Sequence, residues 1–326
     1  MNAPANAAPV SFERGIFCLS FDFELAWGSF YKGSIEALQR KARLTRERVF
    51  PQLLELLTRY QISATWATVG HLLLKSCDGN HGQPQPSPPS FPDWYAYDPK
   101  KNEETSPEWY GSSLVQQLLR LKPEQDIGLH GFSHCVFSDP SCNAAVAKKE
   151  MQNAFDAAHA LGLTPTSFVF PRDGQGHFDV LLEAGIKVYR GSNQNWYFRL
   201  PAPLAKPLHM IHQFLGLAPP TVMPRIEHGL VNLPSSHLYL SMDGFRRFIL
   251  IRSRVRAAHQ ALHQASHWKR IFHLYCHPIS LAYEDSRTQS LLKGFEDILA
   301  LAARLRDSRL LNILNMRQIA QQLTSF

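Results

Sequence analysis

The clearest structural signal in this chain is the stretch GIFCLSFDFE, residues 15–24, where an apolar run ends in two acids. The run scarcely alternates with polar residues, which indicates a strand that is buried on both faces. Such strands are typical of parallel sheets, whose functional side chains gather beyond the carboxyl ends of the strands. Asp22 and Glu24 therefore predict a functional site at the end of this strand.

The rest of the chain alternates short apolar runs with helical patterns. Further strands are predicted at residues 62–69, 126–129, 167–170, 186–189, 270–276 and 310–314, and helices at 34–60, 144–161, 178–184, 287–306 and 316–323. Repeated strand–helix units imply an α/β fold with a parallel sheet, either open or closed into a barrel. We expect a flexible N-terminus, residues 1–14, and one domain over 15–326, with long elaborated loops at 77–111 and 191–234.

Composition narrows the class of protein. With 326 residues, 44% of them hydrophobic, the chain can bury a large core. The net charge of +7 is spread along the chain, which favours a positive surface or an acidic substrate over a nucleic acid partner. Five cysteines without a CxxC pair, and no signal-peptide pattern, favour the cytoplasm. No apolar run approaches the ~20 residues of a membrane span.

Two histidines follow the strand predicted at residues 126–129. His130 and His134 have the i, i+4 spacing of many zinc ligands, and the strand would deliver them to the same edge of the sheet as Asp22. The same spacing recurs at residues 259, 263 and 267, where no strand end or acid accompanies it. We interpret that second stripe as an ordinary helix face, whereas context makes His130 and His134 candidate metal ligands.

An acid next to two histidines completes a donor set for catalysis. Three protein ligands leave a metal position open for water and substrate, which is the pattern of a catalytic site. A second acid can hold or deprotonate that water. An alternative is that Asp22 and Glu24 cap the following helix or pair with basic side chains.

Four motifs in order resemble the polysaccharide deacetylase family, the NodB-homology or carbohydrate esterase 4 family. They are SFDFE at residues 20–24, HGFSH at 130–134, FPR at 170–172 and LYCHP at 274–278. The resemblance covers roughly residues 15–325. It implies an irregular (β/α) barrel, a single divalent ion, and hydrolysis of an N-acetyl or O-acetyl group on a sugar.

The resemblance also implies roles for individual residues. Asp22 matches the catalytic base, His130 and His134 match the metal histidines, and His277 matches the general acid that protonates the leaving amine. Most relatives carry the metal-binding Asp directly after the base, where this chain has Phe23. A subgroup with Asp-x-Asp or Asp-x-Glu places the ligand one residue later, which makes Glu24 the candidate.

The third motif departs from the family pattern, because its arginine follows the proline. We expect Arg172 to orient Asp22, with a surface salt bridge as the competing interpretation. Among the aromatic residues of the two predicted loops, Trp94, Tyr97 and Trp196 could form a rim on which a sugar stacks, although ordinary packing is equally compatible with them.

The sequence thus favours a metal-dependent hydrolase that removes an acyl group, N-acetyl above all, from a sugar. Zinc is the expected ion, with cobalt or nickel as alternatives. The expected substrate is an acylated sugar, sugar nucleotide or oligosaccharide that serves as precursor of a surface polysaccharide. Another C–N amide hydrolase on the same scaffold, cleaving a formyl or ureide bond, stays open, as does a non-catalytic carbohydrate-binding protein.

Overall fold

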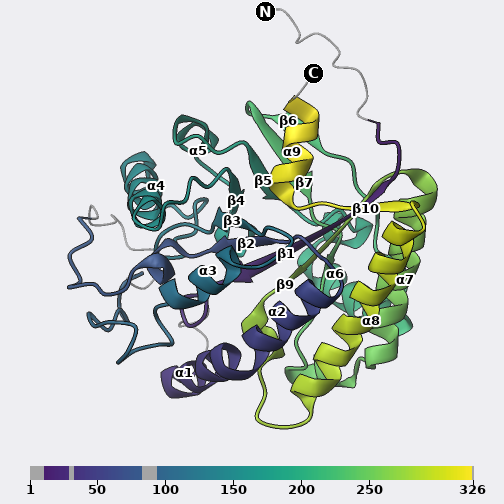
Figure 1. Ribbon diagram of the computed structural model, residues 1–326, viewed down its shortest axis with the longest axis horizontal. Coiled ribbons are helices and arrows are strands. Elements are labelled where there is room, and N and C mark those ends of the chain that lie inside the picture. The colour runs from purple at the N-terminus through teal and green to yellow at the C-terminus, as the bar shows by residue number, and fades with distance from the viewer. Residues whose placement is uncertain (1–10, 29–32, 83–93, 325–326) are drawn as a thin grey trace, which may run out of the picture.

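The first strand is an interior strand of one ten-stranded sheet. The computed structural model describes residues 11–28, 33–82 and 94–324. Within these residues the strands run in the order β6-β7-β5-β4-β3-β2-β1-β9-β8, and β10 pairs with β1 (Figure 1). All pairs are parallel except β6 with β7. The predicted α/β fold with a parallel sheet is therefore confirmed.

Each predicted strand and helix is present, and β6, β7, β8, α3 and α6 occur in addition. The strands are β1 (Gly15–Phe23), β2 (Thr65–Thr68), β3 (Asp126–Leu129), β4 (Ser167–Val169), β5 (Val188–Gly191), β6 (Arg225–Glu227), β7 (Leu230–Pro234), β8 (His237–Leu238), β9 (Ile271–Cys276) and β10 (Leu311–Ile313). The α-helices are α1 (Ile35–Leu44), α2 (Phe50–Arg59), α3 (Ser112–Leu119), α4 (Ala144–His159), α5 (Phe178–Glu183), α6 (Ala202–Leu215), α7 (Ile251–Trp268), α8 (Arg287–Asp307) and α9 (Met316–Thr324).

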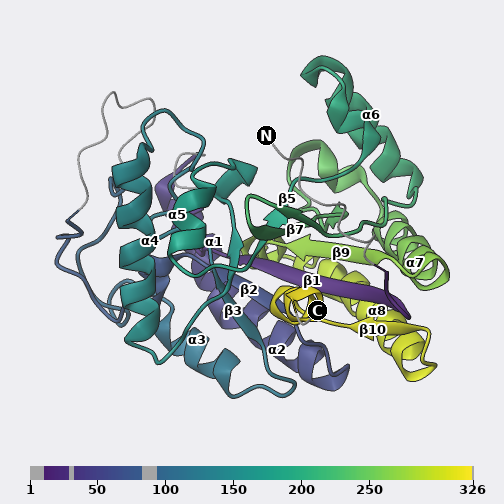
Figure 2. The same cartoon turned by 90° about the horizontal axis from the view of Figure 1, so that it is seen from above.

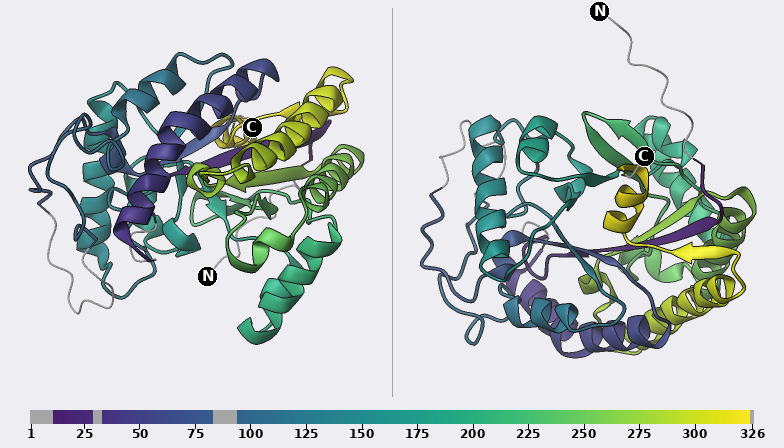
Figure 3. Two further views of the ribbon diagram at one scale, coloured as in Figure 1. Left: turned by 90° about the horizontal axis from the view of Figure 1, so that it is seen from below. Right: turned by 45° about the horizontal axis from the view of Figure 1, so that its top comes forward.

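The two faces of β1 enter different cores. Phe17, Leu19, Phe21 and Phe23 point into the large core beneath the surrounding helices, whose ring is visible in Figure 3. The alternate residues face inward, because successive side chains of a strand point to opposite sides. Ile16 and Cys18 there join a smaller core.

The smaller core shows that the sheet is curled. It contains side chains from β1, β4, β5, β7 and β9, together with Met316 and Ile319 of α9. Strands far apart in the sheet order thus meet over one helix, and α9 contacts both β1 and β5. The sheet is a half-barrel whose interior is filled at one end by α9. The carboxyl ends of the strands, with Asp22 and Glu24, lie at the other end of this interior.

The structure corrects the prediction for the second long loop. Residues 191–234 contain α6, β6 and β7, and α6 projects from the body of the molecule in Figure 2. This helix is hard to predict, because Pro207 lies inside α6 and prolines usually mark loops. In the first loop, the described residues 77–82 and 94–111 form no helix or strand, as expected. Of the predicted flexible N-terminus, residues 1–10 lie outside the described residues.

No described helix combines the length and apolar character that a bilayer-spanning segment needs.

A cavity in the smaller core should lower the stability of the protein strongly. Ile319 on α9 is fully buried, so Ile319→Ala should lower the free energy of unfolding by about 2–5 kcal/mol in urea denaturation. Ile211→Ala on α6 is the matched control, because Ile211 is 52% exposed and its loss should cost less than about 0.5 kcal/mol. Equal effects at the two positions would contradict the placement of α9 in the core.

Candidate active site

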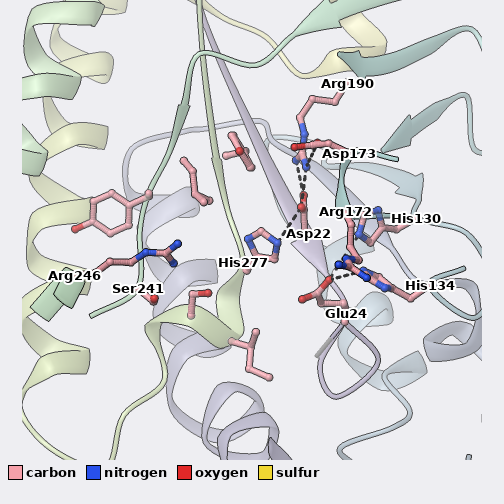
Figure 4. A pocket seen from close by; sticks show the side chains of 16 residues that line it. Asp22, Glu24, His130, His134, Arg172, Asp173, Arg190, Ser241, Arg246 and His277 are labelled. Carbon is pink, nitrogen blue, oxygen red and sulfur yellow. Dashed lines mark hydrogen bonds and ion pairs between the residues drawn. The ribbon is translucent and has the colours of Figure 1, made fainter. Parts of the chain in front are cut away.

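A polar pocket of about 340 Å³ opens at the carboxyl ends of the central strands. Figure 4 shows the charged side chains that converge on it from the end of β1, from β5, and from the segments after β3, β4, β8 and β9. The charged and histidine side chains that line this pocket are Asp22, Glu24, His130, His134, Arg172, Asp173, Arg190, Arg246 and His277. The structure therefore brings all six predicted catalytic and metal-binding residues to one cavity.

The end of β1 separates the two acids from the phenylalanine between them. Asp22 and Glu24 are each 3% exposed and line the pocket. Phe23 points the other way and stacks on Phe50, with 5.5 Å between ring centroids. Strand alternation therefore excludes position 23 from the pocket and makes Glu24 the second acid available there.

Glu24 and the two histidines form a compact donor group. Glu24 Oε2 lies 3.1 Å from His134 Nε2 and 3.7 Å from His130 Nε2. The Nδ1–H of His130 donates to the carbonyl oxygen of Val169 at 2.7 Å, and the Nε2 atom of the same ring faces Glu24. Burial would raise the pKa of Glu24, but His277, His130 and His134 outweigh it and hold that pKa well below its usual range. Glu24 is therefore ionised and able to bind a cation.

A buried carboxylate on α4 shapes the turn that carries both histidines. Glu150 Oε2 accepts the backbone N–H groups of Phe132 and Ser133 at 2.8 and 2.9 Å. Its other oxygen accepts the Ser133 hydroxyl at 2.7 Å. Three hydrogen bonds on one carboxylate fix the turn, which is needed because His134 adopts a left-handed φ of 66°.

Asp22 is held from the opposite wall of the half-barrel. The two terminal nitrogens of Arg190 donate to its two carboxylate oxygens, Nη2 to Oδ2 at 2.7 Å. His277 Nε2 lies 3.2 Å from the same Oδ2. Burial alone would raise the pKa of Asp22, but Arg190 and then His277 outweigh it and lower the pKa to about 2.

The arginine that holds Asp22 in a two-pronged contact is therefore Arg190, which the sequence did not predict, and a role for Arg172 in orienting Asp22 stays a prediction. Arg172 follows β4 and lines the same pocket, in a left-handed conformation with φ 55°. Arg190 belongs to β5, where Val188 and Arg190 both face the interior. Its guanidinium also lies over the ring of Tyr275, 4.2 Å from the centroid.

The aromatic residues expected at a sugar-stacking rim are placed elsewhere. Trp94 is 6% exposed and belongs to the large core, so it packs instead of forming a rim. Tyr97 and Trp196 are exposed, at 47% and 59%, and neither lines the pocket. An adjacent cavity of about 460 Å³ is lined instead by Tyr197 and Phe198.

Among the residues that sequence reasoning missed, Arg190 and Glu150 each left a signal. Arg190 follows the predicted strand 186–189 directly, and a charged residue two positions after the buried Val188 shares its face. Glu150 lies among the apolar positions Ala147, Met151 and Ala154 of its helix, where a solvated acid is not expected.

The architecture and site together define a polysaccharide deacetylase fold, as the resemblance implied. The chain matches a protein assigned as a polysaccharide deacetylase from Mycobacterium smegmatis, with 14% identity, 97% of this chain and 93% of that chain covered, and a TM-score of 0.59. A second protein with that assignment, from Pseudomonas aeruginosa PAO1, matches with 9% identity, 95% and 92% coverage, and a TM-score of 0.58.

An allantoinase has the same fold. The two sequences are 8% identical, the match covers 100% of this chain and 99% of the allantoinase chain, and the TM-score is 0.60. No family model matches the chain. No curated protein matches it either. The likeness to solved structures therefore defines the fold, and the chemistry has to be argued from the site residues.

The buried ion pair of Asp22 and Arg190 predicts a pH-dependent loss of stability. At pH 7, Asp22→Asn should lower the free energy of unfolding by about 3–5 kcal/mol, because Arg190 would stay buried without its counter-charge. The Asp22 carboxyl has a pKa of 3.8 in the unfolded chain and about 2 in the folded protein, so between these pH values the unfolded chain binds a proton that the folded protein does not. The wild type should therefore lose this stabilisation as the pH falls through that window, and the difference between the proteins should narrow.

Urea denaturation at a series of pH values measures this difference. Asp156→Asn on the exposed face of α4 is the control and should track the wild type throughout. An Asp22→Asn protein as stable as the wild type at pH 7 would show that the pair is not a structural constraint.

Proposed function

We propose that this protein is a metal-dependent hydrolase that removes an N-acetyl group from a sugar. The observation that carries the proposal is the arrangement of Glu24, His130 and His134 beside the coupled pair of Asp22 and His277. A cation site, a carboxylate and an imidazole within one pocket are the groups that amide hydrolysis requires.

The donor set fits a divalent ion. Two neutral imidazole nitrogens and one carboxylate are the ligands of many catalytic zinc sites, and they leave a position open. Orientation of His130 by the carbonyl of Val169 supports the same assignment, because metal-bound histidines usually donate their other N–H. Zinc is the expected ion, with cobalt and nickel as substitutes. When bound, such an ion would act as a Lewis acid toward water and the acyl carbonyl.

Asp22 and His277 would handle the proton. In the hydrolysis a water oxygen bonds to the acyl carbon, the C–N bond breaks, and the nitrogen gains a proton. Asp22 would accept the water's proton, although a carboxylate with a pKa near 2 retains a proton poorly. His277, 3.2 Å away, can take that proton and deliver it to the departing nitrogen. Arg190 would keep Asp22 ionised and oriented.

The pocket and its neighbour suggest the size of the substrate. Arg246, Leu238 and Tyr275 line both the catalytic pocket and the adjacent cavity, so the two spaces adjoin. Together they could hold an acylated sugar with a further substituent, such as a second sugar or a nucleotide. Arg246 at the junction would favour a negative group there. Deacetylase assignments among proteins of the same fold support the choice of an acylated carbohydrate.

A second candidate is hydrolysis of a ureide, another C–N bond. It is favoured by the allantoinase whose structure matches this chain over its full length. The same residues would serve, because a ureide also needs an activated carbonyl and a protonated leaving nitrogen. A non-catalytic carbohydrate-binding role is less economical, since binding alone does not require the buried group of Glu24, His130 and His134.

Substitution of the proposed ligand should remove metal and activity together. We expect Glu24→Gln to lower kcat/KM for acetate release at least about 100-fold and to lower the zinc content at the site, because the amide keeps the shape but loses the charge. Zinc analysis and acetate release from a panel of N-acetylated sugars and sugar nucleotides measure both. Glu104→Gln, at an exposed position, is the control and should match the wild type.

The panel should also contain allantoin. Ureide hydrolysis without acetate release would replace the first candidate by the second. If zinc-reconstituted wild type released neither acetate nor a ureide product and bound carbohydrate unchanged, the non-catalytic interpretation would stand.

The imidazole at the end of β9 should affect the chemical step. We expect His277→Ala to lower kcat by about 10²–10⁴-fold with little change in KM or zinc content, because His277 would act as the proton donor and not as a ligand. Steady-state kinetics at several pH values tests this. An unchanged kcat would remove His277 from the mechanism.

A further inference from the structure

A second group of metal-ligating side chains lies outside the pocket, at the start of the first long loop. His71 is in the 3₁₀ helix Gly70–Leu73 after β2, and Cys77, His81 and Asp98 follow it. One ligand atom from each lies within 4.8 Å of the others, and none of the four residues lines the catalytic pocket. We propose that this group is a second zinc site, with a structural role.

The distances fit one ion at the centre of the four side chains. His81 Nε2 and Cys77 Sγ lie 2.7 and 3.2 Å from Asp98 Oδ2. His71 Nε2 lies 3.7 Å from the same oxygen, and Cys77 Sγ lies 3.9 Å from His81 Nε2. Ligands at about 2.0–2.3 Å from a tetrahedral zinc are about 3.3–3.8 Å apart. The observed separations bracket that value.

His71 provides an independent reason to expect a ligand. It is fully buried, and within the described part of the chain neither ring nitrogen has a hydrogen-bond partner. An unpaired buried polar atom destabilises the folded protein, so such imidazoles are rare without a function. Trp27 holds the ring in place, with 4.3 Å between centroids. A metal ion on Nε2 would satisfy the nitrogen that faces Asp98.

The kinds of ligand specify the ion and its role. Two imidazoles, one thiolate and one carboxylate suit zinc, whereas calcium and magnesium prefer oxygen ligands throughout. Four protein ligands close the coordination sphere, which is typical of structural and not catalytic zinc. Binding would release the thiol proton of Cys77 to solvent. The inference is independent of the proposed function, because none of these four ligands lines the catalytic pocket.

This second site would fasten the loop to the turn that bears the catalytic histidines. The backbone N–H groups of Gly70 and His71 donate to the carbonyl oxygens of Gly131 and Phe132, at 2.8 and 3.0 Å. On the loop side, the Tyr95 ring stacks on His81, with 4.5 Å between centroids. The Tyr95 hydroxyl donates to Glu150, the carboxylate that fixes the same turn. Zinc would thus hold the loop that carries His81 and Asp98 against the turn that carries His130 and His134.

Cobalt substitution separates this site from the catalytic one. A thiolate bound to Co²⁺ gives a charge-transfer absorption that histidine and carboxylate ligands do not give. We expect this band in the cobalt-loaded wild type and in His134→Ala, and its loss in Cys77→Ser. Cys142→Ser, which removes a buried thiol elsewhere, is the matched control and should keep the band. Absence of the band from the cobalt-loaded wild type would overturn the proposal.

Alkylation tests the same proposal on the unaltered protein, so it does not depend on the folding of a variant. Cys77 is half-buried, whereas the other four cysteines are buried. Mass spectrometry should find Cys77 protected from iodoacetamide in the zinc-containing protein and modified after chelation. Zinc analysis should find one ion fewer per chain in Cys77→Ser. Equal modification of Cys77 with and without chelator would contradict a zinc site here.

Discussion

The contact between Asp22 and Arg190 is the constraint on which the rest of the site depends. β2, β3 and β4 separate their two strands in the sheet, a span of about 19 Å if the sheet were flat. One arginine side chain can bridge that span only because the sheet curls, and the apolar packing around α9 curls it. The two buried charges, on Asp22 and Arg190, then pair with each other at the open end of the interior.

The same curl explains why the chemistry divides into two adjoining parts. Inward-facing positions at the ends of β1, β3, β5 and β9 converge, so residues from distant parts of the chain share one pocket. In the proposed function, Glu24 and the two histidines would bind the cation on one side of the pocket. Asp22, held by Arg190, would transfer the proton with His277 on the other side. Phe23 joins these parts to the helical core, because its side chain leaves the strand in the opposite direction.

Sequence reasoning recovered what local pattern determines. The order of strands and helices follows from apolar runs and helical periodicity, and strand ends located Asp22, Glu24, His130 and His277. It failed where a partner is chosen by the curl of the sheet, which no local pattern encodes. The prediction therefore names Arg172, in the third motif, and does not include Arg190. The group around His71 was missed for a similar reason, since its ligands have no regular spacing and Asp98 joins them only through the fold of the loop.

Anomalous diffraction from crystals of the zinc-containing protein tests the central claim most directly, because it locates ions without reference to activity. Data collected above and below the zinc absorption edge should give a peak between Glu24 Oε2 and the Nε2 atoms of His130 and His134 that disappears below the edge. The cluster of His71, Cys77, His81 and Asp98 offers an internal reference in the same map. A peak at that cluster with none beside Glu24 would contradict a metal-dependent catalytic site in this protein.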